Sequence, residues 1–137
     1  IRTTVATTGD GEERIARALE LIAGHVDAYP AHVRFITRER HGGVRAVREA
    51  IHDQLGRFTV EVGEALASDP VSAGWSAEDV GMLAQLYVDL ILGTASLFLE
   101  ASGDETGEAR ERVARVAARQ MRLIGIGREH WLDRRGG

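Results

Sequence analysis

The run MLAQLYVDLILGTASLFL, residues 82–99, is the most apolar stretch of the chain and decides its class of fold. Eighteen residues of this composition are long enough to span a membrane as a helix. Asp89 lies near the middle, however, and a central Asp opposes membrane insertion by about 3 kcal/mol, with Gln85 and Gly93 adding to that cost. We therefore expect a helix over residues 77–101 that other helices bury on nearly all sides, and no membrane partner.

Apolar residues recur at steps of three and four on both sides of this run, which is typical of amphipathic helices. The spacing predicts four more helices, from residue 11 to the Tyr29-Pro30 pair and over residues 31–41, 44–66 and 107–133. Asp10 and Ser76 are expected to be N-caps, and the Gly42-Gly43 pair a left-handed C-cap. No strand-like alternation of useful length is present, so the fold is predicted to be an all-α bundle of about five helices.

Composition and charge narrow the classes of function. The chain has 137 residues, the size of one domain, and its net charge of −4 argues against wrapping nucleic acid or lying on an anionic membrane. The sequence contains no cysteine, which excludes disulfides and thiolate metal sites and fits a reducing, cytoplasmic location. Residues 1–11 contain no apolar leader, and the chain opens without Met, as is typical of a fragment.

The sequence offers little support for catalysis. The five histidines never stand four residues apart, so a helical zinc pair and an HExxH motif are both excluded. The segments Ser102-Gly103 and Gly125-Ile126-Gly127 lack the context of a nucleophile elbow or a phosphate-binding loop. We therefore expect no enzymatic activity, no catalytic or metal site and no cofactor.

Polar residues form a narrow stripe along the helix predicted over residues 77–101, at Glu78, Gln85, Asp89, Ser96 and Glu100. The stripe is either a thin solvent-facing or interfacial seam, or a set of polar anchors in an internal cavity. In the second case Asp89 would be buried and would need a partner, for which we expect Arg34 or Arg38. The opposite face is either core or the wall of an apolar pocket, and it carries Tyr87, Ile91, Thr94 and Phe98.

The helix predicted over residues 107–133 carries several distinct faces. Arginines recur along one side in the manner of a solvated charged face, at Arg112, Arg115, Arg119 and Arg122. The side chains of a second face are small enough for another helix to approach closely. This face is made of Ala114, Ala118, Met121 and Gly125. Ile124 and Trp131 belong to a further apolar line. Because one small domain rarely buries two apolar faces of a single helix, we expect a symmetric homodimer joined through the last two helices, with Gly93 and Leu97 also in the interface.

Two segments resemble a known family of proteins. They are AYPAHVRFITRERHGGVRAVREAIHDQLGRF, residues 28–58, and RQMRLIGIGREHWLDRR, residues 119–135. Together with the long apolar helix between them, they resemble the C-terminal part of a TetR-type transcriptional regulator. The resemblance is to the branch that includes the fatty-acid biosynthesis repressor. It covers nearly the whole chain and rests on scattered positions.

This resemblance implies that residues 1–137 are the effector-binding and dimerisation domain of a longer regulator. It implies a homodimer whose last two helices form a four-helix bundle, and a ligand cavity among the preceding helices. It also implies that operator DNA is bound by an N-terminal helix-turn-helix head, for which the residues before Ile15 are too few. The implied effector is a small apolar molecule such as a fatty acyl thioester. With the faces described above, the candidate ligand-binding residues are Phe35, Arg38, Ile51, Phe58, Tyr87, Asp89, Ile91 and Thr94.

A helical protein-interaction or scaffold module without a small-molecule ligand is the alternative class of function. The two classes differ in the interior of the protein. A scaffold is expected to pack the faces of Ile51, Phe58, Tyr87 and Thr94 without a cavity, whereas a sensor keeps a space for its ligand.

Overall fold

The computed structural model describes residues 11–133 of the 137, and these form helices and loops with no strand among them. The predicted all-α class is therefore confirmed. Five α-helices and one 3₁₀ turn follow in order: α2 (Gly11–Ala28), α3 (Pro30–Glu39), α4 (Arg45–Ala67), η1 (Pro70–Ser72), α5 (Ala77–Ala101) and α6 (Glu108–Glu129). The expected N-cap Asp10 and the basic pair at positions 134–135 lie outside the described residues.

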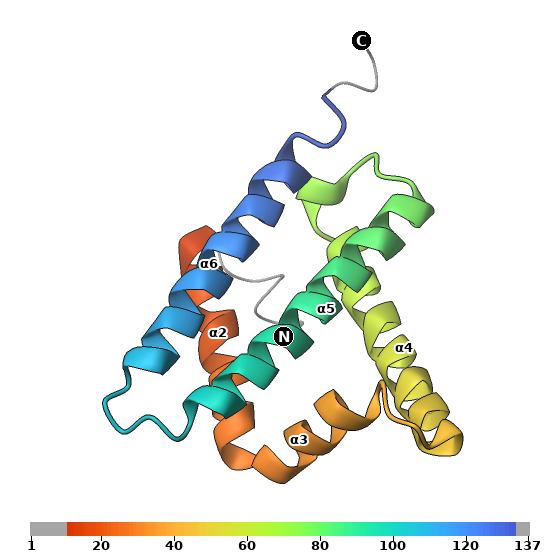
Figure 1. Cartoon of the computed structure of the whole chain (residues 1–137). Coiled ribbons are helices and arrows are strands. Elements are labelled where there is room, and N and C mark those ends of the chain that lie inside the picture. Colours follow the sequence, from red (N-terminus) through yellow and green to blue (C-terminus); the bar gives the residue numbers. More distant parts are fainter. Residues whose placement is uncertain (1–10, 134–137) are drawn as a thin grey trace.

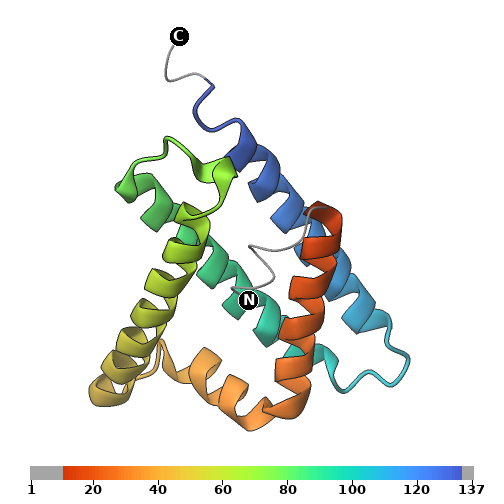
Figure 2. The same cartoon turned by 180° about the vertical axis from the view of Figure 1, so that it is seen from behind.

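Helix α5 is the element against which the rest of the chain packs, because it contacts α2, α3, α4 and α6. Figure 1 shows α5 and α6 on the near side of the molecule. In the view from behind, α2, α3 and α4 form three sides of a frame that lies across α5 (Figure 2). The most apolar segment of the sequence thus becomes the common neighbour of all the other helices.

The prediction that α5 is buried on nearly all sides is wrong. By length and composition, α5 is the only helix within residues 11–133 that would suit a membrane span, yet only 33% of its apolar window is buried inside the chain. One face carries Leu83, Val88 and Phe98 into the core. The opposite face has no covering helix, and Leu86 and Leu97 there remain about half exposed, at 47% and 49%.

The buried side chains form two separate clusters. The first joins α2, α3, α5 and α6 and contains Leu19, Ile22, Val26, Val33, Phe98, Ala117 and Met121. The second joins α4 to the first half of α5 and contains Val62, Leu66, Leu83, Ala84 and Val88. Small domains usually have one contiguous core, so the interruption between these clusters calls for a physical explanation.

The ends of the helices follow the sequence with two exceptions. Ser76 caps α5 as predicted, because its Oγ accepts a hydrogen bond from the Asp79 amide at 3.0 Å. The Gly42-Gly43 pair does not adopt the left-handed conformation expected of a C-cap. Instead, α3 ends in a turn closed by the Gly42 amide, which donates to the Glu39 carbonyl at 2.9 Å.

Helix α6 ends at Glu129, four residues before the predicted end. Beyond it, the Trp131 ring stacks on Trp75 with 5.7 Å between the ring centroids, and the Trp131 indole N–H donates to the Asp79 carboxylate at 3.1 Å. These contacts join the segment after α6 to the loop before α5. The loop in question, residues 68–76, also packs beside the second cluster through Trp75.

The second cluster gives a direct test of the packing. Leu66 is 1% exposed, whereas Leu21 on α2 is 46% exposed. Leu66→Ala is expected to lower the free energy of unfolding by about 2–5 kcal/mol, because it opens a cavity that the surrounding helices cannot close. Leu21→Ala should change it by about 0.5 kcal/mol, as for a surface substitution. Urea denaturation followed by circular dichroism measures both, and equal effects of the two substitutions would contradict the described packing.

Candidate functional site

A partly enclosed cavity of about 280 Å³ lies between the two clusters and separates them. Its apolar wall combines residues of both clusters and their neighbours on α2, α4, α5 and α6: Ile15, Ala18, Ile22, Val62, Leu66, Ile91 and Met121. The size is at the lower end of the range of small-molecule sites, about 300–1,000 Å³. The cavity therefore explains why the core is interrupted.

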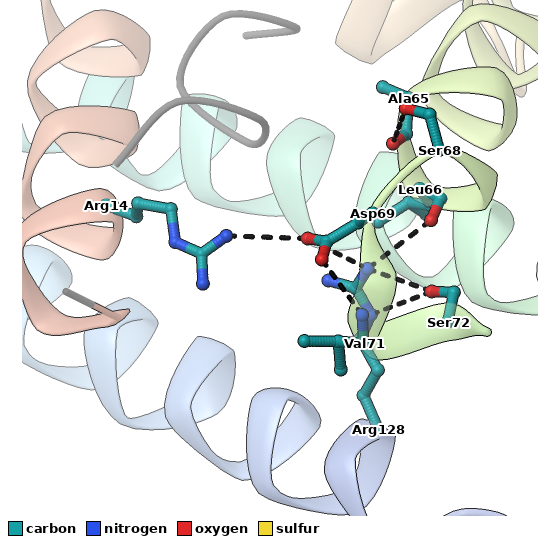
Figure 3. Close-up of polar contacts among 8 residues, drawn as sticks. All are labelled: Arg14, Ala65, Leu66, Ser68, Asp69, Val71, Ser72 and Arg128. Atoms are coloured by element: carbon teal, nitrogen blue, oxygen red, sulfur yellow. Dashed lines mark hydrogen bonds and ion pairs between the residues drawn. The ribbon is translucent and has the colours of Figure 1, made fainter. Parts of the chain in front are cut away.

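One end of the cavity is polar and is built around Arg128 near the end of α6 (Figure 3). Only 8% of Arg128 is exposed. Its Nε and Nη2 donate to the Ser72 hydroxyl at 3.2 and 2.9 Å, and Nη2 also donates to the Leu66 carbonyl at 3.5 Å. The same Nη2 lies 3.2 Å from the Asp69 carboxylate, so the buried charge has a carboxylate partner.

Asp69 holds this end together because its two carboxylate oxygens have different partners. Its Oδ1 accepts from the Val71 amide at 3.0 Å and caps η1, where Pro70 fixes the first turn. Its Oδ2 meets Arg128 and also accepts from Arg14 Nη1 of α2 at 3.5 Å. The loop after α4, the end of α6 and the start of α2 are thus joined through one carboxylate, as Figure 3 shows.

Tyr87 of α5 completes the polar end of the cavity. Burial raises the pKa of its hydroxyl above the usual value, and the nearby guanidinium groups of Arg128 and Arg14 offset only part of that increase. The phenol therefore stays protonated at neutral pH and remains a hydrogen-bond donor. The combination of an apolar wall with a few polar groups at one end is the usual construction of a small-molecule site.

Of the eight candidate ligand-binding residues, Tyr87 and Ile91 line the cavity. Phe58 packs on the second cluster instead, and Ile51 and Thr94 are buried without lining the cavity. The remaining three, Phe35, Arg38 and Asp89, are exposed. The stripe on α5 was the strongest polar signal in the sequence, and it does not reach this cavity.

The expected pairing of Asp89 with Arg34 or Arg38 is wrong. Asp89 is exposed and accepts a hydrogen bond from Gln85 Nε2 at 3.0 Å. Arg38 donates from Nε to the Glu39 carboxylate at 3.0 Å. Asp89 needs no buried cation because its face of α5 has no helix over it, which confirms the interpretation of the stripe as an outward-facing seam.

The small-residue face of α6 is turned toward α2 within the same chain. Met121 is 6% exposed in the first cluster, Ala114 and Ala118 pack against that cluster, and Gly125 lines the cavity. A shallow groove of about 670 Å³ between α2 and α6 leaves Ala114 and Ala118 only partly covered. Gly93 and Leu97 are exposed on α5, as an intermolecular contact would require.

Sequence reasoning missed Arg14, Asp69, Ser72 and Arg128. A signal for Arg128 was present, because Ala117, Met121 and Arg128 follow one another at steps of four and seven on α6 and are all buried. A charged residue in the buried register of an amphipathic helix indicates a polar site inside the protein. No comparable pattern indicates which loop supplies its partner.

The chain was compared with protein families, curated proteins and solved structures, and no match was found in any of the three comparisons. Its function is therefore inferred from the cavity and from the surfaces around it.

The Asp69–Arg128 pair gives the second prediction. Asp69→Asn keeps the size and the acceptor oxygen but leaves Arg128 without its carboxylate, so we expect the free energy of unfolding to fall by about 3 kcal/mol. The matched control is Glu49→Gln, because Glu49 forms an exposed pair with Arg45 at 2.8 Å on α4. That change should alter stability by about 0.5 kcal/mol. Urea denaturation at neutral pH compares them, and a similar loss in both variants would show that the buried pair has no special role.

Proposed function

We propose that the chain is the effector-binding and dimerisation domain of a TetR-type transcriptional regulator. In this proposal a small apolar effector, such as a fatty acyl compound, occupies the cavity and alters operator binding by a separate N-terminal head. The observation that carries the proposal is the cavity of about 280 Å³ that splits the core. The sequence resemblance of residues 28–58 and 119–135 supports the choice of family.

The cavity favours a sensor over a scaffold module. A protein that only presents a surface gains stability by filling its interior, because buried cavities cost packing energy. Here four helices contribute apolar side chains to an open space, and a buried guanidinium and a phenol lie at one end of it. These features are expected of a site that recognises a molecule with an apolar body and a polar end.

The proposed mechanism is a shift between two arrangements of the helices. A ligand in the cavity would contact α2 through Ile15, α5 through Tyr87 and α6 through Arg128. Only a difference in ligand affinity between the two arrangements moves the equilibrium, and typical coupling free energies are about 1–3 kcal/mol. In the intact regulator the head would precede α2, so a displacement of α2 against α6 would be transmitted to it.

The outward face of α5 and α6 is the proposed dimer surface. Four apolar side chains on this surface are about half exposed or more: Leu86 and Leu97 on α5, and Val116 and Leu123 on α6. The polar stripe of α5, which includes the acidic residues Glu78, Asp89 and Glu100, lies on the same outward face of that helix. The arginines of α6 are also exposed, at Arg112, Arg115, Arg119 and Arg122. In a two-fold dimer α5 of one copy meets α6 of the other, so these opposite charges would face each other at the rim of the contact.

A test of the dimer uses one exposed residue on each side of the molecule. The chain is expected to be a dimer at micromolar concentration, and Leu123→Glu should convert it to a monomer by burying a charge in an apolar contact. Leu123 is 72% exposed in the single chain, so the change should not disturb its fold. Val60→Glu on α4 is the control, since Val60 is 61% exposed away from this surface. Sedimentation equilibrium gives the masses, and a monomeric parent chain would contradict the proposed surface.

A test of the cavity uses a substitution that fills it. Saturating acyl compounds are expected to stabilise the parent chain and so raise its unfolding temperature. At a ligand concentration a hundredfold above Kd, the free energy of unfolding should increase by about 2.7 kcal/mol. Ile91→Trp should abolish this response by occupying the space, while Phe35→Trp on the exposed face of α3 should retain it. Differential scanning calorimetry measures both. Should a panel of acyl acids, esters and thioesters leave the parent chain unchanged, the proposed sensing function would be excluded.

A further inference from the structure

The cavity and the groove between α2 and α6 meet at one place. Glu12 and Ile15 at the start of α2, and Arg122 on α6, line both of them. Helices α2 and α6 contact each other, and they lie side by side in both views (Figures 1 and 2). Ile15 is half-buried, so its side chain stands between the enclosed space and the open one. The two spaces are therefore neighbours that share a wall of side chains.

The floor of the groove is apolar. Among the described residues that line it, every uncharged side chain is hydrophobic: Ile15, Ala16, Leu19, Ala23, Phe98, Ala114 and Ala118. A hydrocarbon suits such a floor, because it gains free energy by removing apolar area from water and needs no hydrogen-bond partner. A ligand segment with many polar groups would find no uncharged donor or acceptor side chain there.

The rim of the groove carries charges of both signs. Its exposed charged residues are Glu12, Glu20, Glu111, Arg115, Arg119 and Arg122. Because acidic and basic groups alternate in water, which screens them, the rim does not favour a ligand of either charge. The arginines can also lay their aliphatic stems along apolar surface while the guanidinium groups stay hydrated. The groove is therefore suited to an uncharged apolar chain.

The groove ends at an ion pair that joins the same two helices. Arg110 in the first turn of α6 donates from Nη1 and Nη2 to the two carboxylate oxygens of Asp27 on α2, at 3.2 and 2.7 Å. Its guanidinium carbon lies 5.7 Å from the centre of the Phe98 ring. From Arg122 to Arg110 the groove follows α6 for about 18 Å, at about 1.5 Å per residue. The groove thus has a defined length, with the boundary at Ile15 at one end and this bridge at the other.

From this arrangement we propose that the cavity and the groove form one binding site for a long-chain acyl compound, whose hydrocarbon passes Ile15 and lies along the groove toward Phe98. The cavity of about 280 Å³ takes the part of the ligand next to its polar end, and the groove of about 670 Å³ takes the rest of the chain. A change of the Ile15 rotamer lets the chain pass. The inference rests on the proposed sensing function and deepens it, because it names the length class of the ligand.

The test first varies the length of the ligand. Isothermal titration calorimetry of the 137-residue chain is performed with sodium octanoate, decanoate, dodecanoate and tetradecanoate, each below its micelle-forming concentration. A methylene that is half covered in the groove gains about half the free energy of a fully buried one, which corresponds to about twofold in affinity. Tetradecanoate is therefore expected to bind about 60-fold more tightly than octanoate, at one ligand per chain.

The test then fills the groove. Ala118→Trp places a large side chain on its floor, so we expect tetradecanoate to bind at least about tenfold more weakly and octanoate to change less than about twofold. Ala16→Trp fills the groove from α2 at an exposed position and should act in the same way, even if Ala118→Trp impairs folding. The matched control is Ala50→Trp on α4, because Ala50 is exposed and lines neither space. It should leave the whole series unchanged.

The outcomes separate this inference from the proposed function. A rise in affinity with chain length that the two groove variants remove supports the continuous site. Affinity that is highest for octanoate or decanoate and falls for longer chains overturns the inference while the sensing function stands. Tetradecanoate binding that both groove variants leave unchanged has the same consequence. Absence of binding by all four compounds overturns the inference and counts against the sensing function as well.

Discussion

The buried contact between Arg128 and Asp69 is the interaction on which the arrangement of this chain depends. A guanidinium that is only 8% exposed must find a carboxylate and hydrogen-bond acceptors, because a buried charge without a partner costs several kcal/mol. The chain meets this demand with the loop that follows α4, where Asp69, Ser72 and the Leu66 carbonyl converge. Arg14 then brings α2 to the same carboxylate. The ends of three helices are thereby fixed at defined positions around a space that none of them fills.

That space lowers the stability of the domain, because side chains that line a cavity lose packing contacts. A domain of this size normally gains most from one continuous core, and here the interior is divided between a cluster around α2 and α6 and a cluster around α4. Departures from good packing in natural proteins are concentrated at sites of function. The polar groups at one end of the cavity fit that interpretation, because polar side chains are placed beside an apolar space while every enclosed side-chain polar atom within the described residues has a partner.

Much of the fold follows from the sequence, and the site does not. The bounds of α5 were predicted at Ala77 and Ala101, and Ser76 caps it, because local periodicity and capping chemistry determine such features. Which helix covers which face is a tertiary property. The small face of α6 was assigned to a second copy, but α2 of the same chain covers Met121. Asp89 was conspicuous within an apolar run and proved to face outward, whereas Arg128 was overlooked among many surface arginines although its position matched the buried register.

The central claim is that a small apolar ligand binds in the cavity between α2, α4, α5 and α6, beside the Asp69–Arg128 contact. Hydrogen exchange followed by mass spectrometry, with and without a saturating acyl compound, tests this claim most directly. The account predicts slower exchange in residues 66–75 and in residues 123–131 on binding, with little change in α3, which does not contribute to the cavity. Saturated binding that leaves both segments unchanged, or that protects α3 instead, would contradict it.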